Sequence, residues 1–125
     1  MALVDREGLE ALSTRRLGSE LGCEAMSIYH HFPGKAHLMD ALVDLMLAEA
    51  QVTMADEWDW LQRMRHAAHG FRNRALKHPK FFPYFAVHRL NTPSGVAFID
   101  GIIGIFREAG FSDRDAATYF REIGY

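Results

Sequence analysis

The N-terminal third of the chain has apolar residues at helical spacing, separated by glycine and proline. Leu17 and Leu21 lie four residues apart, on one helical face, and Gly22 follows as a C-terminal stop. Ile28 and Phe32 repeat this spacing in the next segment, which a Pro-Gly pair ends. The pattern predicts two short helices joined by a tight turn.

The second of these helices, over about 24–32, carries side chains suited to a groove. Between its apolar positions lie a small, an apolar, a hydroxyl and three ring side chains, namely Ala25, Met26, Ser27, Tyr29, His30 and His31. A helix, a turn containing glycine and a second helix with such an outer face are typical of a DNA-binding helix-turn-helix.

A more specific spacing runs through the same segment: Leu-Gly, six residues, Tyr-x-His-Phe, two residues, Lys. The residues that carry the match are Gly8-Leu9, Ser13-Thr14-Arg15-Arg16-Leu17, Leu21-Gly22, Ile28-Tyr29-His30-His31-Phe32, Lys35 and Leu38. On these residues, segment 3–47 resembles the DNA-binding domain of the tetracycline-repressor (TetR) family of transcriptional regulators. Gly18 departs from the family pattern, which usually has Ala there, and glycine inside a helix costs about 1 kcal/mol relative to Ala.

In a helix-turn-helix, the two helices are expected to make different contacts with DNA. The second helix enters the major groove and its neighbour crosses the DNA backbone, so we expect Thr14 and Arg15 to contact phosphates. Lys35, after the Pro-Gly pair, is expected to do the same with a full charge. The three ring side chains Tyr29, His30 and His31 are also expected at phosphates, which position the protein.

The leading end of the recognition helix is expected to read base edges. Ala25 and Met26 suit a thymine methyl group, and Ser27 can donate to or accept from several bases. Alternatives stay open from the sequence: Met26 as a core residue, Tyr29 packed between helices with its hydroxyl exposed, and Arg15 and Arg16 as solvated charges. Adjacent histidines point about 100° apart on a helix, which disfavours a shared metal ion.

The rest of the chain also has helical periodicity and no alternating strand pattern. Lys35–Gln51 is expected as one helix with an apolar stripe at Leu38, Leu42, Leu45 and Met46. Further helices are expected at Trp58–His78, Phe81–Leu90, Thr92–Ala109 and Asp115–Tyr125. The predicted fold is therefore all-α, with a three-helix DNA-binding domain at 1–50 and a helical regulatory domain at 51–125.

The distribution of charge along the chain bears on the expected DNA contacts. The chain of 125 residues has a formal net charge of −2, which is unusual for a DNA-binding protein. Residues 25–37 nevertheless contain no acid, whereas Lys35 and three histidines lie there. The single cysteine, Cys23, fits a reducing cytoplasm, and no apolar run is long enough for a membrane span or a signal peptide.

Both ends of the chain are expected to be incomplete. The first helix has only about two turns before Gly8, whereas the resembled family usually begins earlier. At the other end, Tyr119 and Phe120 form an apolar face that no later residue covers. The helices that pair two subunits in the resembled family lie mostly beyond this point.

The aromatic-rich second region suggests a small-molecule site between helices. Apolar walls with a few polar groups are usual for such sites, and the candidate lining residues are Met64, Phe71, Phe85, His88, Phe98 and Ile102. Each of them also suits an ordinary core position. His66 and His69 lie three residues apart, but no further ligand at helpful spacing joins them, so no metal is expected.

Two other classes of protein compete with a repressor. One is a small helical enzyme that pairs His66 with Glu57 or Asp59, although no nucleophile elbow, phosphate loop or paired-acid motif supports it. The other is a helical interaction module, favoured only by the acidic charge. We expect a cytoplasmic, homodimeric repressor without cofactor, metal or catalytic residues. It would bind double-stranded operator DNA and leave it when an apolar or aromatic effector shifts helix Lys35–Gln51.

Overall fold

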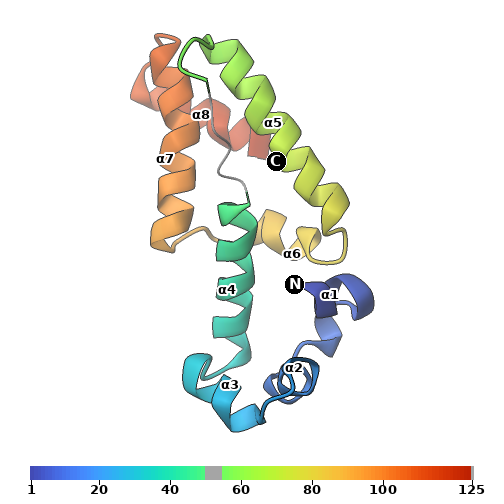
Figure 1. Cartoon of the computed structure of the whole chain (residues 1–125). Helices are drawn as coiled ribbons and strands as arrows, with labels where there is room; N and C mark the ends of the chain where they lie inside the picture. The colour runs from blue at the N-terminus through green and yellow to red at the C-terminus, as the bar shows by residue number, and fades with distance from the viewer. Residues whose placement is uncertain (50–54, 125) are drawn as a thin grey trace.

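The computed structural model describes residues 1–49 and 55–124, and these residues form helices joined by turns (Figure 1). The N-terminal elements are α1 (Ala2–Glu7), the 3-10 turn η1 (Leu9–Ala11), α2 (Thr14–Leu21), α3 (Ala25–His31) and α4 (Lys35–Ala48). The later elements are α5 (Trp60–Lys77), α6 (Phe82–Val87), α7 (Pro93–Glu108) and α8 (Asp113–Gly124). The expected all-α fold is confirmed.

Local capping chemistry sets where the helices begin. The Ser13 hydroxyl accepts the backbone N–H of Arg16 at 3.1 Å at the start of α2. Asp59 and Gln62 form a reciprocal capping box at the start of α5, with hydrogen bonds of 2.8 and 2.9 Å. The Thr92 hydroxyl accepts from the N–H of Gly95 at the start of α7. Each cap satisfies backbone donors that a helix would otherwise leave unpaired.

Several expected boundaries differ from the observed ones. The helix expected from Trp58 begins at Trp60, because Asp59 is the capping residue. The helix expected over Phe81–Leu90 is shorter, and α8 starts two residues before Asp115. The expected end of the helix from Lys35, at residue 51, lies outside the described residues.

The buried face of α4 is also displaced from the expected stripe. Leu38 and Met46 are buried as expected, but Leu45 is 42% exposed and Val43 is fully buried in its place. The cause is that α4 packs on both the N-terminal helices and α7, which turns a different side of the helix inward.

One hydrophobic core joins the N-terminal helices to α6. Val4 of α1, Val43 and Met46 of α4, and Phe81 at the start of α6 all have side chains with no exposed surface. They belong to a cluster completed by Leu3, Leu12, Ile28, Leu38, Met39, Leu47 and Phe85. The second region of the chain is therefore anchored on the first through apolar contacts of the kind that dominate folding energetics.

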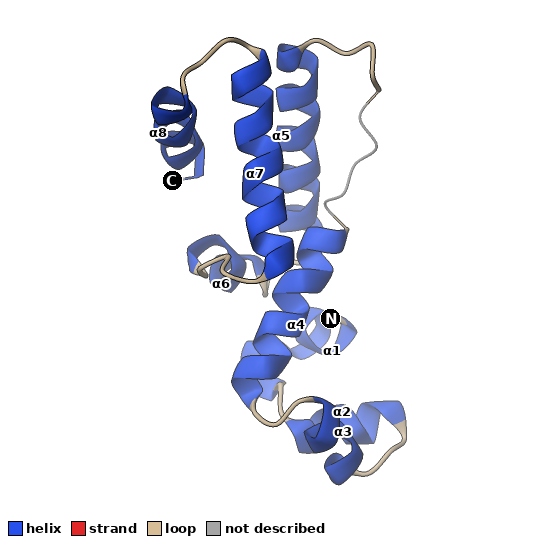
Figure 2. Ribbon diagram, turned by 90° about the vertical axis from the view of Figure 1, so that its left-hand side faces the viewer, coloured by secondary structure: helices blue, strands red, loops and turns tan. Residues whose placement is uncertain are grey.

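The helices are arranged along α4. In Figure 1, α2 and α3 lie at the lower end of α4, whereas α5 and α7 extend beyond its upper end. Figure 2 shows α5 and α7 side by side, and α8 packs against α7. No helix in the described ranges is long and apolar enough to cross a membrane.

Candidate DNA-binding interface and effector region

The turn between α2 and α3 depends on two glycines. Gly22 ends α2 with φ 67° and ψ 29°, a left-handed conformation that glycine adopts at low cost. At Gly18, an added Cβ would lie 2.8 Å from the carbonyl oxygen of Cys23 and 3.3 Å from the N of Ala25. A Cβ at this position would therefore require a shift of the backbone near Cys23 in this protein, an effect that opposes the helix-propensity cost of glycine.

The outer face of α3 is free of the rest of the protein. Ile28 is the buried residue of this helix, whereas Met26 is 63% and Tyr29 is 52% exposed. At 100° per residue, Met26 and His30 point almost directly away from Ile28. The alternative that buries Met26 in the core is thus excluded, and both side chains have exposed surface available to a partner.

The remaining members of the expected DNA-contact set lie around this face. Ser27, His30 and His31 are exposed, and Ala25 is half-buried at the start of α3. Thr14 is half-buried at the first position of α2, and Arg15 beside it is exposed. Lys35 begins α4, where its ammonium lies 3.4 Å from the carbonyl oxygen of Leu9 and remains exposed.

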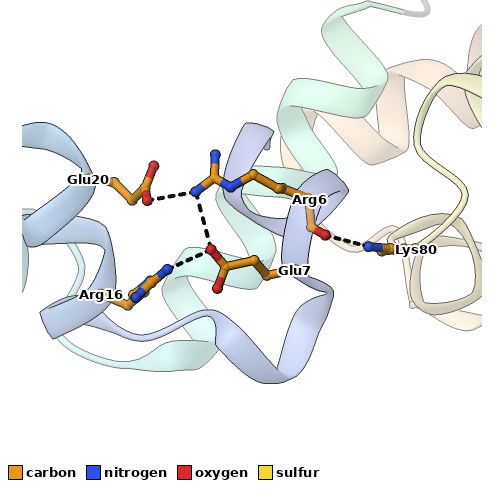
Figure 3. A network of polar contacts seen from close by, with 5 residues as sticks. All are labelled: Arg6, Glu7, Arg16, Glu20 and Lys80. Atoms are coloured by element: carbon orange, nitrogen blue, oxygen red, sulfur yellow. Dashed lines mark hydrogen bonds and ion pairs between the residues drawn. The ribbon is translucent and has the colours of Figure 1, made fainter.

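A polar network ties α1 to α2 (Figure 3). Arg16 donates to the Glu7 carboxylate at 2.5 Å, and Arg6 donates to Glu20 at 2.6 Å and to Glu7 at 3.3 Å. The hydrogen bond from Arg16 lowers the pKa of Glu7, and the hydrogen bond to Glu20 raises the pKa of Arg6. Arg16 is therefore engaged within the protein, whereas Arg15 forms no ion pair among the described residues. The sequence does not reveal this division between two adjacent arginines.

A second polar cluster lies where the α5–α6 turn meets α1 and α4. His78 is 4% exposed, and its Nδ1 lies 2.8 and 2.9 Å from the two carboxylate oxygens of Asp5. Its Nε2 lies 3.4 Å from Glu49, which also accepts from Lys77 at 2.9 Å. The hydrogen bond from Lys77 and then that from His78 lower the pKa of Glu49. Sequence reasoning missed this cluster, because its members are far apart in the chain.

The ammonium of Lys80 extends the contact between the two regions. It donates to the backbone carbonyl of Arg6 at 2.5 Å, as Figure 3 also shows. The α5–α6 turn thus holds the last residues of α1, and α1 in turn holds α2 through Arg6 and Glu7.

Two of the expected effector residues come together with a third aromatic ring. The Phe71 ring of α5 lies 5.1 Å from the Phe82 ring and 6.2 Å from the Phe85 ring, measured between ring centroids. Phe71 is 37% exposed, whereas Phe85 belongs to the shared core. We call Phe71, Phe82 and Phe85 the α5–α6 aromatic cluster.

The other expected effector residues lie on the helices around this cluster. His88 ends α6 and stacks on Tyr84 with ring centroids 5.0 Å apart. Its Nε2 lies 3.3 Å from the Asp40 carboxylate, but the alignment is not that of a hydrogen bond. Met64 of α5 and the α7 residues Phe98 and Ile102 are half-buried, and Phe98 packs against the shared core.

A separate aromatic cluster lies at the far end of α5 and α7. Phe111 contacts Trp60, Phe106 and Tyr119, with centroid separations of 6.1, 5.8 and 5.3 Å. The expected uncovered face of the last helix is therefore partly covered, since Tyr119 lies on Phe106 and Phe111 and is 46% exposed. Most of the aromatic content of the second region divides between these two clusters.

The residues proposed for other chemistry have structural partners. Asp59 is the capping residue of α5, and the His66 ring lies 4.9 Å from the Trp58 ring. Within residues 1–49 and 55–124, no three His, Cys, Asp or Glu side chains lie close enough together to hold a metal ion.

Comparison with known proteins identifies the chain. The profile of bacterial regulatory proteins of the tetR family matches residues 1–42, and the profile of the tetracyclin repressor-like C-terminal domain matches residues 54–123. The second match alone covers more than half of the sequence. This chain belongs to the TetR family. Members of the TetR family are transcriptional regulators and not enzymes, so the enzyme alternative built on His66 is not supported.

Known repressors and solved structures of the family align with nearly the whole of this chain. The class A tetracycline repressor protein from transposon 1721 of Escherichia coli is 33% identical over 98% of this chain, which spans 57% of that protein. A TetR structure from Acinetobacter baumannii AYE in complex with minocycline has a TM-score of 0.82 at 26% identity, covering 98% of this chain and 65% of that one. The Streptomyces coelicolor TetR family protein ActR in complex with actinorhodin has a TM-score of 0.80 at 25% identity, with coverages of 98% and 60%.

The chain thus spans little more than half the length of the tetracycline repressors that it matches. Its TetR-family fold is shared along the whole of that span.

Proposed function

We propose that this protein is a ligand-responsive transcriptional repressor that binds double-stranded operator DNA in the cytoplasm as a homodimer. The observation that carries the proposal is the outer face of α3, where Met26, Ser27, Tyr29, His30 and His31 are all exposed. This face contains no acid, and in a helix-turn-helix the second helix of the pair enters the major groove, which supports the proposal. Membership of the TetR family supports both halves of the proposal.

Phosphate contacts are tested through salt dependence. Each phosphate that a cation neutralises releases counterions, so Lys35→Ala should weaken binding to all sequences alike and flatten the salt slope by about one. Arg114→Ala is the charge-matched control, because Arg114 is exposed on α8. Fluorescence anisotropy of a duplex between low and high salt measures both quantities. An unchanged slope for Lys35→Ala would count against a phosphate contact there.

Base readout is tested by selection from random duplexes. Changing Met26 or Ser27 should alter the preferred bases, since both are exposed at the leading end of α3. Changing His30 should weaken binding with little change in preference, because phosphate contacts carry little sequence information. The preferred operator should be pseudo-palindromic if the protein binds as a symmetric dimer.

Release of the DNA would follow from a shift of α4. An apolar or aromatic effector would bind near α5, α6 and α7, which surround the end of α4 that lies farthest from α3 (Figure 2). Half-sites are separated by about 34–36 Å, so a movement of α4 in each subunit would prevent simultaneous docking of both recognition helices. The effector can change DNA affinity only by its difference in affinity for the two states.

Reciprocity gives the test of this switch. If the effector weakens operator binding by some factor, the operator must weaken effector binding by the same factor. Titrating a candidate effector with and without operator measures that factor directly. Equal effector affinities in both titrations would leave a DNA-binding protein without a switch.

A further inference from the structure

Arg74, in the last turn of α5, is a buried cation without a partner among the described residues. The residue is 6% exposed, and its Nε is buried with no hydrogen-bond acceptor. None of the ion pairs in the described ranges includes its guanidinium. Arginine is almost never buried in this way unless it is paired.

Glu49, the carboxylate whose charge acts on Arg74, is already engaged with other side chains. Desolvation lowers the pKa of Arg74, and the charge of Glu49 opposes this effect without forming an ion pair. Glu49 instead accepts from Lys77 and His78. A buried charge without a counter-ion is costly, so this site favours an anion supplied from elsewhere.

The position of Arg74 connects it with the candidate effector region. Phe71, a member of the α5–α6 aromatic cluster, lies three residues earlier on the same face of α5, and His78 lies four residues later. Arg74 therefore stands between the aromatic rings and the polar cluster that holds α1 and α4.

We propose that Arg74 is the anion receptor of the effector site, and that the effector is an aromatic molecule with an anionic group such as a carboxylate, sulfonate or phenolate. The rings of the effector would pack on the α5–α6 aromatic cluster while its anion accepts from the Arg74 guanidinium. A planar guanidinium suits a carboxylate or sulfonate because it offers several donors in a fixed fork. This inference rests on the proposed effector function and adds the charge of the ligand to it.

Binding at Arg74 would also bring the effector close to the polar contacts at the end of α4. An anion at Arg74 would lie about one helical turn from the contacts that Glu49 makes with Lys77 and His78. The anion would weaken the electrostatic attraction between Arg74 and Glu49. Because Glu49 follows directly after α4, this change would act at the end of that helix.

Two fluorescent probes with the same rings but different charge test the proposal. Anilinonaphthalene sulfonate is an aromatic anion, and phenyl-naphthylamine is its neutral counterpart. Both are titrated into the full-length protein and into Arg74→Met, Arg74→Lys and Arg72→Met. Arg72 is exposed on the same helix and controls for attraction of the sulfonate to surface charge.

We expect Arg74→Met to weaken binding of the sulfonate at least tenfold while the neutral probe binds as before. Arg74→Lys should restore part of the loss, and Arg72→Met should change neither affinity. The melting temperature of Arg74→Met should be equal to or above that of the unchanged protein, because an apolar side chain replaces an unpaired buried charge.

Two results would overturn the proposal. One is an equal loss of both probes, or a loss of neither, in Arg74→Met. The other is a melting temperature several degrees lower, which would show that Arg74 already has an internal partner. The proposed function fails separately: if no ligand releases operator DNA while the sulfonate still requires Arg74, the anion site stands without the switch. If a neutral ligand releases DNA and Arg74→Met leaves sulfonate binding unchanged, the switch stands and the anion site does not.

Discussion

Helices α3 and α5 present the residues proposed for DNA and effector binding in opposite ways. Within α3, Ile28 is buried and Ala25 is half-buried, whereas the other side chains are exposed. In α5, by contrast, Arg74 is buried, and Phe71, although 37% exposed, lies against two other rings of the protein. A surface meant for an external partner can be recognised from local spacing, whereas an interior site depends on which distant elements surround it.

The two regions are nevertheless joined by a common core and by polar contacts. Phe81 of the second region is fully buried among residues of α1 and α4. His78 and Lys80 contact Asp5 and the backbone of Arg6. The residues of α3 and α5 therefore differ in how far they are exposed, although the two regions share one core.

The largest effect is expected from Phe81, which would break the connection between the two regions. Phe81→Ala should lower the free energy of unfolding by about 3–5 kcal/mol through lost burial and a cavity. Val87→Ala, 83% exposed on the same helix α6, should change it by less than about 0.5 kcal/mol. Chemical denaturation followed by circular dichroism and by tryptophan fluorescence gives both values.

The same experiment shows whether the regions unfold together. Both tryptophans, Trp58 and Trp60, are in or just before α5, so their fluorescence reports on the second region. Circular dichroism reports on all helices. Coincident transitions are expected for the unchanged protein, and two separate transitions would show that the shared core does not couple the regions.

The next largest effect concerns the geometry that presents α3. Gly18→Ala should destabilise the protein by about 1–3 kcal/mol, because its Cβ would overlap the carbonyl of Cys23. Gly101→Ala is the matched control in α7, where a Cβ would meet nothing within 4 Å. That change should stabilise the protein by up to about 1 kcal/mol through helix propensity. Similar effects of the two changes would remove the argument for close helix approach at Gly18.

The third prediction separates two adjacent arginines of α2. Arg15→Gln should weaken DNA binding about tenfold, or about 1.4 kcal/mol, and reduce the salt slope by about one. Arg16→Gln should leave the slope unchanged, since Arg16 is paired with Glu7. Anisotropy titrations over a range of salt concentrations measure both slopes, and a larger change for Arg16 would reverse the assignment.

The smallest effect is expected in acid, at the contact between α4 and α5. The pKa of Glu49 is lowered from its ordinary value of 4.5, so its carboxylate stabilises the fold above that pH. This contribution is lost as the pH falls below about 4.5 through the lowered pKa. Glu49→Gln should remove this contribution, so the free energy of unfolding of the variant should fall less in acid, by under about 1 kcal/mol, when measured against pH by chemical denaturation. Glu10→Gln, an exposed acid without an ion pair among the described residues, should leave the curve unchanged.

Much of the candidate DNA interface could be predicted because its signals are local. The position of the turn follows from Gly22, and the inward positions of α3 follow from the spacing of Ile28 and Phe32. Residues not required for this packing were left to face outward, which is where the structure places Met26 and Tyr29. The assignment of individual side chains to bases or phosphates stays a prediction.

Other features could not be predicted because they require contacts between distant segments. Arg74 resembles the exposed Arg72 in sequence, and only the packing of α5 makes one buried and the other free. His78 acquires a role only when Asp5 and Glu49 lie beside it. The six candidate effector residues likewise share helical spacing with ordinary core residues.

The sequence by itself determined the helices, their stops and the exposed face of α3, because hydrogen bonds, capping and periodicity act over a few residues. The tertiary structure alone decided that a Cβ at Gly18 would meet the Cys23 carbonyl, that Leu45 faces outward and that Arg74 is buried without a partner among the described residues. The physical reason is that burial and electrostatic pairing depend on neighbours in space, which one linear pattern of residues does not specify.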